Sequence, residues 1–238
     1  MFLINQQHEI SEHSWHILCD FDGTISLEDT TDHLLEKFAL TGWQDIEQQW
    51  EHGLIGSKQC MQQQIALLNM NQQQLYQCLD QIKIDQGFLD LVQLTHRHHI
   101  LLTIVSDGLD LVIQYILKKH NIEPLPIIAN HLVQVNDTQW RLEFPNANAA
   151  CKSASGTCKC KVALAQKKEH IILIGDGRSD FCLAETADFV FAKKSLIQYC
   201  KSKQISHTPF SIFSEIYQPL EKLLLSDFEL EHCEMVIA

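Results

Sequence analysis

The amino-acid sequence predicts an α/β fold built on an open, mostly parallel, Rossmann-like sheet. It also predicts a small helical insert after the first strand and a β-hairpin after the third. Two observations support this fold class. Short apolar runs rich in β-branched residues alternate with segments whose apolar residues recur at helical spacing. Three of the predicted strands also end in polar clusters, as strands do at the ligand-binding edge of such sheets.

The first part of the chain predicts one strand followed by helices. Residues 16–20 (HILCD) form a short apolar run that ends in a carboxylate and a glycine-containing turn, which is typical of a buried strand. From Ser26 the apolar residues follow a helical period, with Ser26 as the expected N-cap and Asp29 as its carboxylate partner. The glutamine-rich residues 43–86 keep helical apolar stripes, so we expect packed helices and not a disordered tract.

The second part of the chain predicts the remaining elements. The continuous apolar run at residues 100–105 is typical of a strand buried on both faces, and it ends at Ser106. Further strands are expected at residues 124–130, 171–174 and 189–192, with a hairpin between residues 132–135 and 139–144. Helices are expected at residues 87–97, 109–117, 159–168 and 211–225. The expected domains are an α/β core of residues 14–26 and 87–238 and a helical insert of residues 27–86.

Composition and charge narrow the class of partner. The 238 residues carry a formal net charge of −12, which argues against nucleic acid or an anionic membrane surface as the partner. No apolar stretch approaches the roughly 20 residues that cross a bilayer, and the N-terminus lacks the pattern of a signal peptide. We therefore expect a soluble, cytoplasmic monomer or homodimer that acts on a small molecule.

The cysteines predict reduced thiols. Their number, nine, is odd, they are scattered along the chain, and a core of this size does not need cross-linking. Cys151, Cys158 and Cys160 could form part of a zinc site, but the spacing lacks paired knuckles and offers no fourth ligand. A reduced loop is the favoured interpretation.

Three polar clusters are expected to meet at one edge of the sheet: DFDGT at residues 20–24, SDG at 106–108 and GDGRSD at 175–180. Each cluster alone is also a common surface turn. Together they would place Asp20, Asp22 and Asp176 at close range, where they repel one another unless a cation lies among them. Carboxylate and carbonyl oxygens favour Mg²⁺, which usually shares its shell with a substrate phosphate. The sequence thus predicts a magnesium-dependent enzyme for a small phosphate ester.

The residue types suggest a role for each side chain. Asp20 is the expected nucleophile, forming an aspartyl phosphate. Asp22 would protonate the leaving oxygen and later deprotonate the hydrolytic water. Ser106, with the N–H groups of Asp107 and Gly108, would bind phosphate oxygens.

A lysine is expected to complete the site. It should come from residues 152–168, a basic segment without acidic residues. Lys161 is favoured because it begins an apolar helical pattern, and Lys159 is the alternative.

These motifs resemble those of haloacid dehalogenase-type phosphatases. The resemblance implies that Asp20, the carbonyl of Asp22 and Asp176 bind Mg²⁺, with Asp180 orienting the metal shell or the lysine. It assigns the phosphate serine and the lysine to Ser106 and Lys161. The helical insert resembles the four-helix cap of the phosphoserine phosphatase-like branch. The second acidic residue of the first motif favours phosphoryl chemistry over dehalogenation.

Two segments narrow the resemblance further. Residues 158–161 (CKCK) and 175–182 (GDGRSDFC) are similar to those of a group of phosphatases that act on 2-hydroxy-3-keto-5-methylthiopentenyl-1-phosphate, phosphoethanolamine or phosphocholine. The first of these is the leading expected substrate, and phosphoserine is a further alternative. A phosphotransferase and a non-catalytic, Mg²⁺-dependent phosphate-binding regulator are the rival functions; the intact set of catalytic residue types argues against the regulator.

The resemblance also indicates two specificity residues. Relatives that act on phosphoserine carry a glutamate nine residues after the nucleophile, where this chain has Asp29. Arg178 stands where a small residue is common, and we expect it to narrow the pocket or contact an anionic group.

Overall fold

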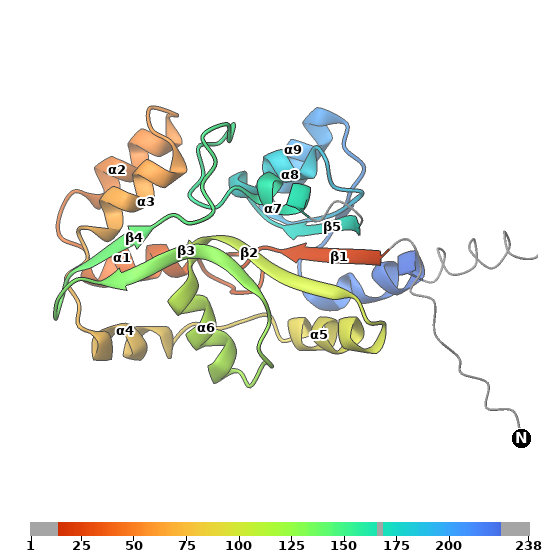
Figure 1. The fold of residues 1–238 in the computed structure, drawn as a ribbon, viewed down its shortest axis with the longest axis horizontal. Helices are drawn as coiled ribbons and strands as arrows, with labels where there is room; N and C mark the ends of the chain where they lie inside the picture. Colours follow the sequence, from red (N-terminus) through yellow and green to blue (C-terminus); the bar gives the residue numbers. More distant parts are fainter. Residues whose placement is uncertain (1–13, 166–168, 225–238) are drawn as a thin grey trace, which may run out of the picture.

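The computed structural model describes residues 14–165 and 169–224 and arranges them as helices on both faces of a seven-stranded sheet (Figure 1). The strand order is β4-β3-β2-β1-β5-β6-β7, and every neighbouring pair is parallel except β3 and β4. The strands are β1 (Ser14–Cys19), β2 (Leu101–Leu109), β3 (Ile127–Gln134), β4 (Trp140–Glu143), β5 (Glu169–Gly175), β6 (Phe189–Ala192) and β7 (Thr208–Pro209). This architecture confirms the predicted fold class.

The register of the central strands brings the polar clusters together. In β1, Cys19 is aligned with Ile104 of β2 and with Ile174 of β5. Because these strands are parallel, the residues that follow each aligned position leave the sheet at the same edge. Asp20 and Asp176 are therefore close neighbours although they are far apart in the sequence.

Helices on the two faces of the sheet bury two apolar clusters. One cluster contains Ile17 and Cys19 and extends to α5 (Gly87–Arg97) and α6 (Asp110–Lys119). The other contains Leu18 and extends to α7 (Lys159–Ala165), α8 (Phe181–Ala184) and α9 (Lys194–Lys203). This alternation along β1 is expected for a central strand buried on both faces.

The helical insert leaves the α/β core at Ser26 and returns at Ile84, where the two segments form an antiparallel bridge. Figure 1 shows α4 beside α6, whereas α2 and α3 lie on the other side of the sheet, near β4. The insert contains the helices α1 (Thr30–Phe38), α2 (Trp43–Glu51), α3 (Ser57–Ile65) and α4 (Gln72–Leu79).

The expected start of the first insert helix is wrong. Asp29 is the N-cap of α1, because its carboxylate accepts hydrogen bonds from the backbone N–H groups of Thr31 and Asp32. The Ser26 hydroxyl instead donates to the carbonyl oxygens of Phe21 and Glu28 and thus stabilises the turn before the helix.

The second part of the chain differs from the expectation in several places, and the helices α8 and α9 and the strand β7 were not predicted. The strand expected at residues 124–130 and the first hairpin arm form one strand, β3, which pairs with β4. β2 continues past Ser106, with an irregularity between Val105 and Leu109. The expected C-terminal helix begins at residue 217, after a 3₁₀ turn at Phe213–Glu215; its last expected residue and residues 166–168 lie outside the described residues.

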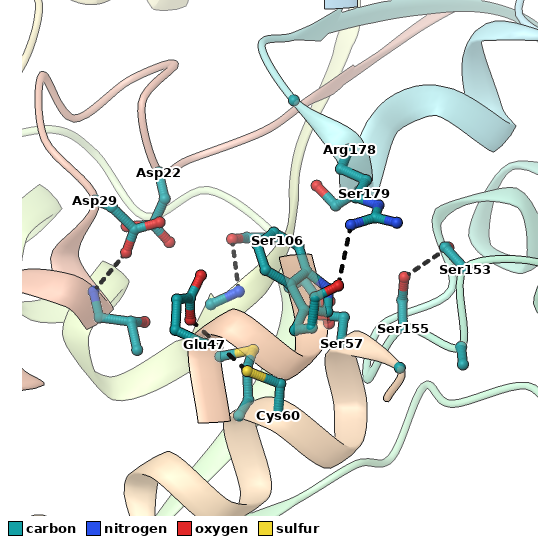
Figure 2. Close-up of a pocket in the computed structure, with 18 of the residues that line it drawn as sticks. Asp22, Asp29, Glu47, Ser57, Cys60, Ser106, Ser153, Ser155, Arg178 and Ser179 are labelled. Carbon is teal, nitrogen blue, oxygen red and sulfur yellow. Dashed lines mark hydrogen bonds between the residues drawn. The ribbon is translucent and has the colours of Figure 1, made fainter. Parts of the chain in front are cut away.

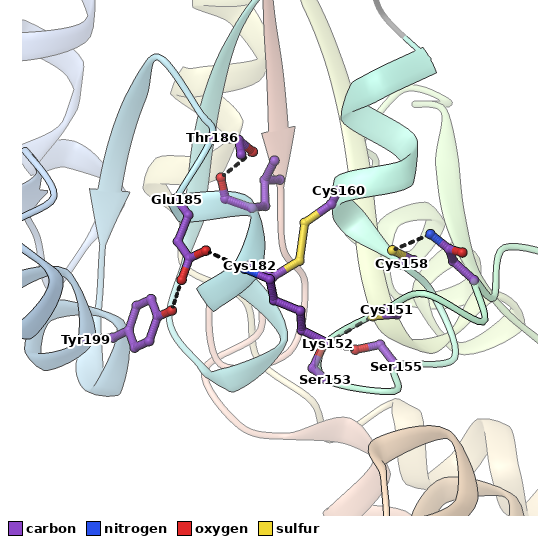
Figure 3. Close-up of a disulfide and its surroundings, with 12 residues drawn as sticks. Cys151, Lys152, Ser153, Ser155, Cys158, Cys160, Cys182, Glu185, Thr186 and Tyr199 are labelled. Carbon is purple, nitrogen blue, oxygen red and sulfur yellow. Dashed lines mark hydrogen bonds and ion pairs between the residues drawn. A yellow bond between two sulfur atoms is a disulfide. The ribbon is translucent and has the colours of Figure 1, made fainter.

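The expectation that all cysteines are reduced is also wrong. Cys160 of α7 and Cys182 of α8 form a disulfide, because these two helices pack side by side and bring the two Cα atoms to 6.5 Å (Figure 3). Among the described residues the free cysteines are Cys19, Cys60, Cys78, Cys151, Cys158 and Cys200. None of the described helices combines the length and apolar character needed to cross a membrane.

Candidate active site

A cavity of about 660 Å³ lies where the carboxyl ends of β1, β2 and β5 face the helical insert. Figure 2 shows Asp22 and Asp29 on one side of this cavity, Arg178 and Ser179 on another, and Ser57 and Cys60 of α3 facing them. All three predicted polar clusters contribute to its lining. The expected convergence of these clusters on one edge of the sheet is thus what the structure shows.

Asp20 lines this cavity, and its carboxylate is almost fully buried. Its Oδ1 accepts a hydrogen bond from the backbone N–H of Phe21 at 2.8 Å. The same oxygen forms an ion pair with Lys159 Nζ at 2.9 Å. Burial raises the pKa of the Asp20 carboxyl well above its usual value; the neighbouring Asp180 adds to this, and Lys159 opposes it. The other oxygen, Oδ2, accepts a long hydrogen bond of 3.5 Å from the Ser179 hydroxyl and is the less firmly held of the two.

Lys159, and not Lys161, is the lysine that reaches the site. Its Nζ is buried and contacts Asp20 at 2.9 Å and Asp180 at 2.6 Å, and these two carboxylates raise its pKa against the effect of burial. Lys161 is exposed and donates to the carbonyl of Ala147 at 3.4 Å. The expected placement of Lys161 is wrong because α7 begins at Lys159, and two residues rotate the side chain about 200° around a helix.

Asp20, Asp176 and Asp180 each offer an oxygen within 4.8 Å of the others, which is a donor set that could hold a metal ion. Both oxygens of Asp180 are already engaged, by Lys159 and by the backbone N–H groups of Asp176 and Gly177. Asp180 thus also contacts the lysine and the 176–177 turn, whereas Asp20 and Asp176 are the members of this donor set that line the cavity. Two hard carboxylates beside an open cavity fit Mg²⁺.

Asp22 points from the first motif toward the helical insert. Its Oδ1 accepts two hydrogen bonds from Thr30, at 2.8 Å from the backbone N–H and 2.6 Å from the hydroxyl. Burial and the nearby Asp29 raise the pKa of Asp22 to about 7. A Cβ at Gly108 would collide with Asp22 Oδ2, so this glycine permits the close approach of the first and second motifs. A carboxyl of this pKa is suited to proton transfer near neutral pH.

Ser106 lines the cavity, as expected, but the second motif differs from the expected phosphate cradle. The Gly108 N–H donates to Ser106 Oγ at 2.9 Å and is not free for a ligand. The Asp107 carboxylate is buried and accepts hydrogen bonds from Ser57 Oγ at 2.5 Å and the Thr157 N–H at 2.9 Å. Asp107 thus connects the helical insert to the loop that precedes Lys159.

Comparison with known proteins agrees with this geometry. The family model described as haloacid dehalogenase-like hydrolase matches residues 17–185, which is more than half of the chain. The chain belongs to the haloacid dehalogenase-like hydrolase family. The resemblance inferred from the motifs is thereby confirmed, and the chain is a phosphoric monoester hydrolase.

Two curated relatives of this haloacid dehalogenase-like phosphatase carry the name 2-hydroxy-3-keto-5-methylthiopentenyl-1-phosphate phosphatase. The relative from an Exiguobacterium species is 33% identical over 208 residues, covering 85% of this chain and 95% of its own. The relative from Bacillus cereus is 27% identical over 221 residues, covering 89% of this chain and 98% of its own.

Solved structures show the same fold. A phosphoserine phosphatase described as a phospho-aspartyl intermediate analogue superposes with a TM-score of 0.65 at 18% identity, covering 87% of this chain and 98% of its own. A probable phosphoserine phosphatase from Vibrio cholerae superposes with a TM-score of 0.69 at 18% identity, covering 92% of this chain and 67% of its own. Phosphatases of this family generally use Mg²⁺.

Both expected specificity residues line the cavity of the phosphatase. Asp29 uses Oδ1 as the α1 cap, at 2.9 Å from the Thr31 N–H, and it lies beside Asp22 on one side of the cavity (Figure 2). Arg178 donates to the carbonyl of Trp50 at 3.3 Å, and its guanidinium lies 5.2 Å from the centre of the Trp50 ring. Arg178 therefore contacts the helical insert beside the cavity.

Two groups of residues that line the cavity were not predicted from the sequence motifs. Glu47 of α2 accepts a hydrogen bond from Gln64 of α3 at 2.7 Å, and both side chains face the cavity from the insert. No local pattern distinguishes them from the other polar residues of this glutamine-rich segment. Lys194 forms an ion pair with Asp176 at 2.9 Å. Its position could have been inferred, because it follows β6, which ends at the same edge of the sheet.

Proposed function

We propose that this phosphatase hydrolyses a small phosphate monoester through an aspartyl phosphate on Asp20. The buried Asp20 carboxylate supports the proposal: one oxygen is fixed by Lys159 while the side chain lines an open cavity. Asp20 and Asp176 would hold Mg²⁺. When bound, the ion supplies positive charge that offsets the repulsion between these carboxylates and an incoming phosphoryl group.

In the first step, Asp20 Oδ2 attacks phosphorus, forming a new P–O bond as the ester P–O bond breaks. Protonated Asp22 gives its proton to the leaving oxygen, and the alcohol departs. In the second step, Asp22 takes a proton from a water molecule as the water oxygen attacks phosphorus. The bond between phosphorus and Asp20 breaks, which releases phosphate and free Asp20. Lys159 and Asp180 hold the nucleophile in place throughout.

This mechanism predicts that Asp22→Asn affects poor and good leaving groups differently. We expect the first turnover of an alkyl phosphate to slow by about 10²-fold or more. The first turnover of 2,4-dinitrophenyl phosphate should stay near the wild-type rate and give a burst of dinitrophenol, because that leaving group needs no proton. Stopped-flow and quenched-flow measurements of the first turnover with each ester would test this difference. Equal slowing of both first turnovers would exclude Asp22 as the acid.

The same role predicts a pH dependence for the wild-type enzyme. Only protonated Asp22 can donate, and its raised pKa of about 7 means that the protonated fraction falls as the pH rises through this value. The first turnover of an alkyl phosphate should therefore decline above about pH 7, while that of the dinitrophenyl ester should not. Parallel profiles for both esters would contradict the assignment.

We propose 2-hydroxy-3-keto-5-methylthiopentenyl-1-phosphate as the preferred substrate. The names of the curated relatives support this proposal, and these relatives align with this chain over nearly their whole length. The insert side of the cavity also contributes apolar groups, Trp50, Leu54, Ile55 and Met61, which would pack against an apolar methylthio chain.

A second candidate is a phosphate ester with a cationic group, such as phosphoethanolamine or phosphocholine. Asp29, Asp32 and Glu47 line the insert side of the cavity. Burial, together with Asp29 and Glu47, raises the pKa of Asp32 to about 7. A substrate ammonium bound there would relieve the repulsion among these carboxylates.

A panel of phosphorylated metabolites tests the choice of substrate. We expect kcat/KM for the ketone phosphate to exceed those for phosphoethanolamine, phosphocholine and phosphoserine by about tenfold or more. Asp29→Asn keeps a capping residue at the start of α1. It should change the ratio of kcat/KM among these substrates more than the rate with p-nitrophenyl phosphate. Higher kcat/KM for a cationic ester would favour the second candidate, and equal loss on all substrates would remove Asp29 from specificity.

A further inference from the structure

Lys194 is a cavity residue to which neither the motifs nor the mechanism above assigns a role. It is the first residue of α9, its side chain is exposed, and its Nζ lies 2.9 Å from Asp176 Oδ2. Lys159 contacts Asp20 and Asp180, and no contact with Asp176 is among its described ion pairs. Among the residues that the structure describes, Lys194 is therefore the cation that pairs with the carboxylate of Asp176.

The backbone of Lys194 carries a second observation. Its φ is +40°, in the left-handed region that residues other than glycine rarely adopt. Glycine would adopt this conformation freely. A long cationic side chain at such a position indicates that the side chain has a use in the folded protein.

The backbone of Asp176 is held by groups other than the Lys194 side chain. The backbone carbonyl of Asp176 accepts hydrogen bonds from the Leu196 N–H at 3.0 Å and from Ser195 Oγ at 3.2 Å. Its backbone N–H donates to Asp180 at 3.0 Å. What Lys194 adds is positive charge beside the carboxylate. Gly23 makes room for this pair, because a Cβ there would collide with both Asp176 Oδ2 and Lys194 Nζ.

We propose that Lys194 is a built-in counter-ion for Asp176, holding its charge in the metal-free enzyme and competing with the divalent cation for this carboxylate. The proposal rests on the assignment of Asp176 as a metal ligand. Three carboxylates lie together at this site, and Lys159 pairs with two of them. Without Lys194, Lys159 alone would face three carboxylates, so the site would hold one more uncompensated negative charge, which destabilises the fold but attracts a cation more strongly.

The test is isothermal titration of MgCl₂ into the metal-free protein, with thermal unfolding of the same samples. We expect Lys194→Met to bind Mg²⁺ roughly tenfold more tightly, while its metal-free melting temperature falls. Lys194→Arg should keep wild-type affinity. Lys201→Met, at the far end of α9, removes the same charge from an exposed side chain and should change neither quantity. Lys194→Gln is the second variant if Lys194→Met does not fold.

The outcomes separate this proposal from the proposed metal site. Unchanged or weaker Mg²⁺ binding in both Lys194→Met and Lys194→Gln would overturn the counter-ion role. If Asp176→Asn binds Mg²⁺ as tightly as the wild type, Asp176 is not a ligand and the metal site itself is wrong. Tighter binding in Lys201→Met as well would show a general effect of net charge, which would also overturn the proposal.

Discussion

Asp20→Asn is expected to lower kcat for phosphomonoesters by about 10⁴-fold or more, because an amide cannot form the acyl phosphate. The fold should survive. The Asp20 carboxyl is buried with a raised pKa, so a neutral side chain of the same shape removes repulsion with Asp180. Phosphate release measured under saturating substrate, together with thermal unfolding, checks both parts.

Asp137→Asn is the matched control for this substitution, because Asp137 lies exposed in the turn between β3 and β4, outside the residues that line the cavity. It should retain wild-type turnover. Activity within tenfold of the wild type in purified Asp20→Asn would remove Asp20 from the chemistry.

Lys159→Met should have the largest combined effect on activity and stability. It leaves the buried carboxylates of Asp20 and Asp180 without their shared cation, and breaking a buried ion pair in this way costs about 3 kcal/mol or more. The free nucleophile would also lose its fixed orientation, so we expect kcat to fall by at least about 10²-fold. Urea unfolding and steady-state kinetics measure the two effects.

The loss of stability in Lys159→Met should depend on pH. Burial raises the pKa of Asp20 even with the lysine present, and removing the lysine raises it further. A carboxyl whose pKa is raised in the folded state costs stability as the pH rises through that pKa, and the cost disappears when the group is protonated. The difference in unfolding free energy between wild type and Lys159→Met should therefore be smaller at pH 5 than at pH 8.

Lys161→Met is the matched control, since it removes the same charge from the same helix, two residues away and in solvent. It should unfold and turn over as the wild type does. The reverse pattern, an inactive Lys161→Met and a fully active Lys159→Met, would restore the assignment suggested by the sequence motif.

The strand ends could be predicted from the sequence because their pattern is local. An apolar run followed by a carboxylate and a glycine places Asp20 and Asp176 at the edge of the sheet, and parallel pairing aligns them. The choice between Lys159 and Lys161 is not local. It depends on where α7 begins, and the loop just before α7 is held by a tertiary hydrogen bond from the Thr157 N–H to Asp107. Apolar periodicity does not contain this information.

Other features could not be predicted from the sequence for a similar reason. The disulfide between Cys160 and Cys182 depends on the packing of α7 against α8. The contact of Arg178 with Trp50 depends on the placement of the helical insert over the α/β core. Each joins segments whose proximity follows from tertiary packing alone.

Chemical trapping of the covalent intermediate tests the central claim most directly. The wild-type enzyme is mixed with the preferred ester, quenched in acid at steady state and reduced with borohydride, which converts a phosphorylated aspartate into homoserine. Peptide mass spectrometry then locates the modified residue. The proposed mechanism predicts homoserine at position 20 and its absence from the Asp20→Asn variant. Homoserine at position 22 or 176, or active turnover with no homoserine at any position, would contradict it.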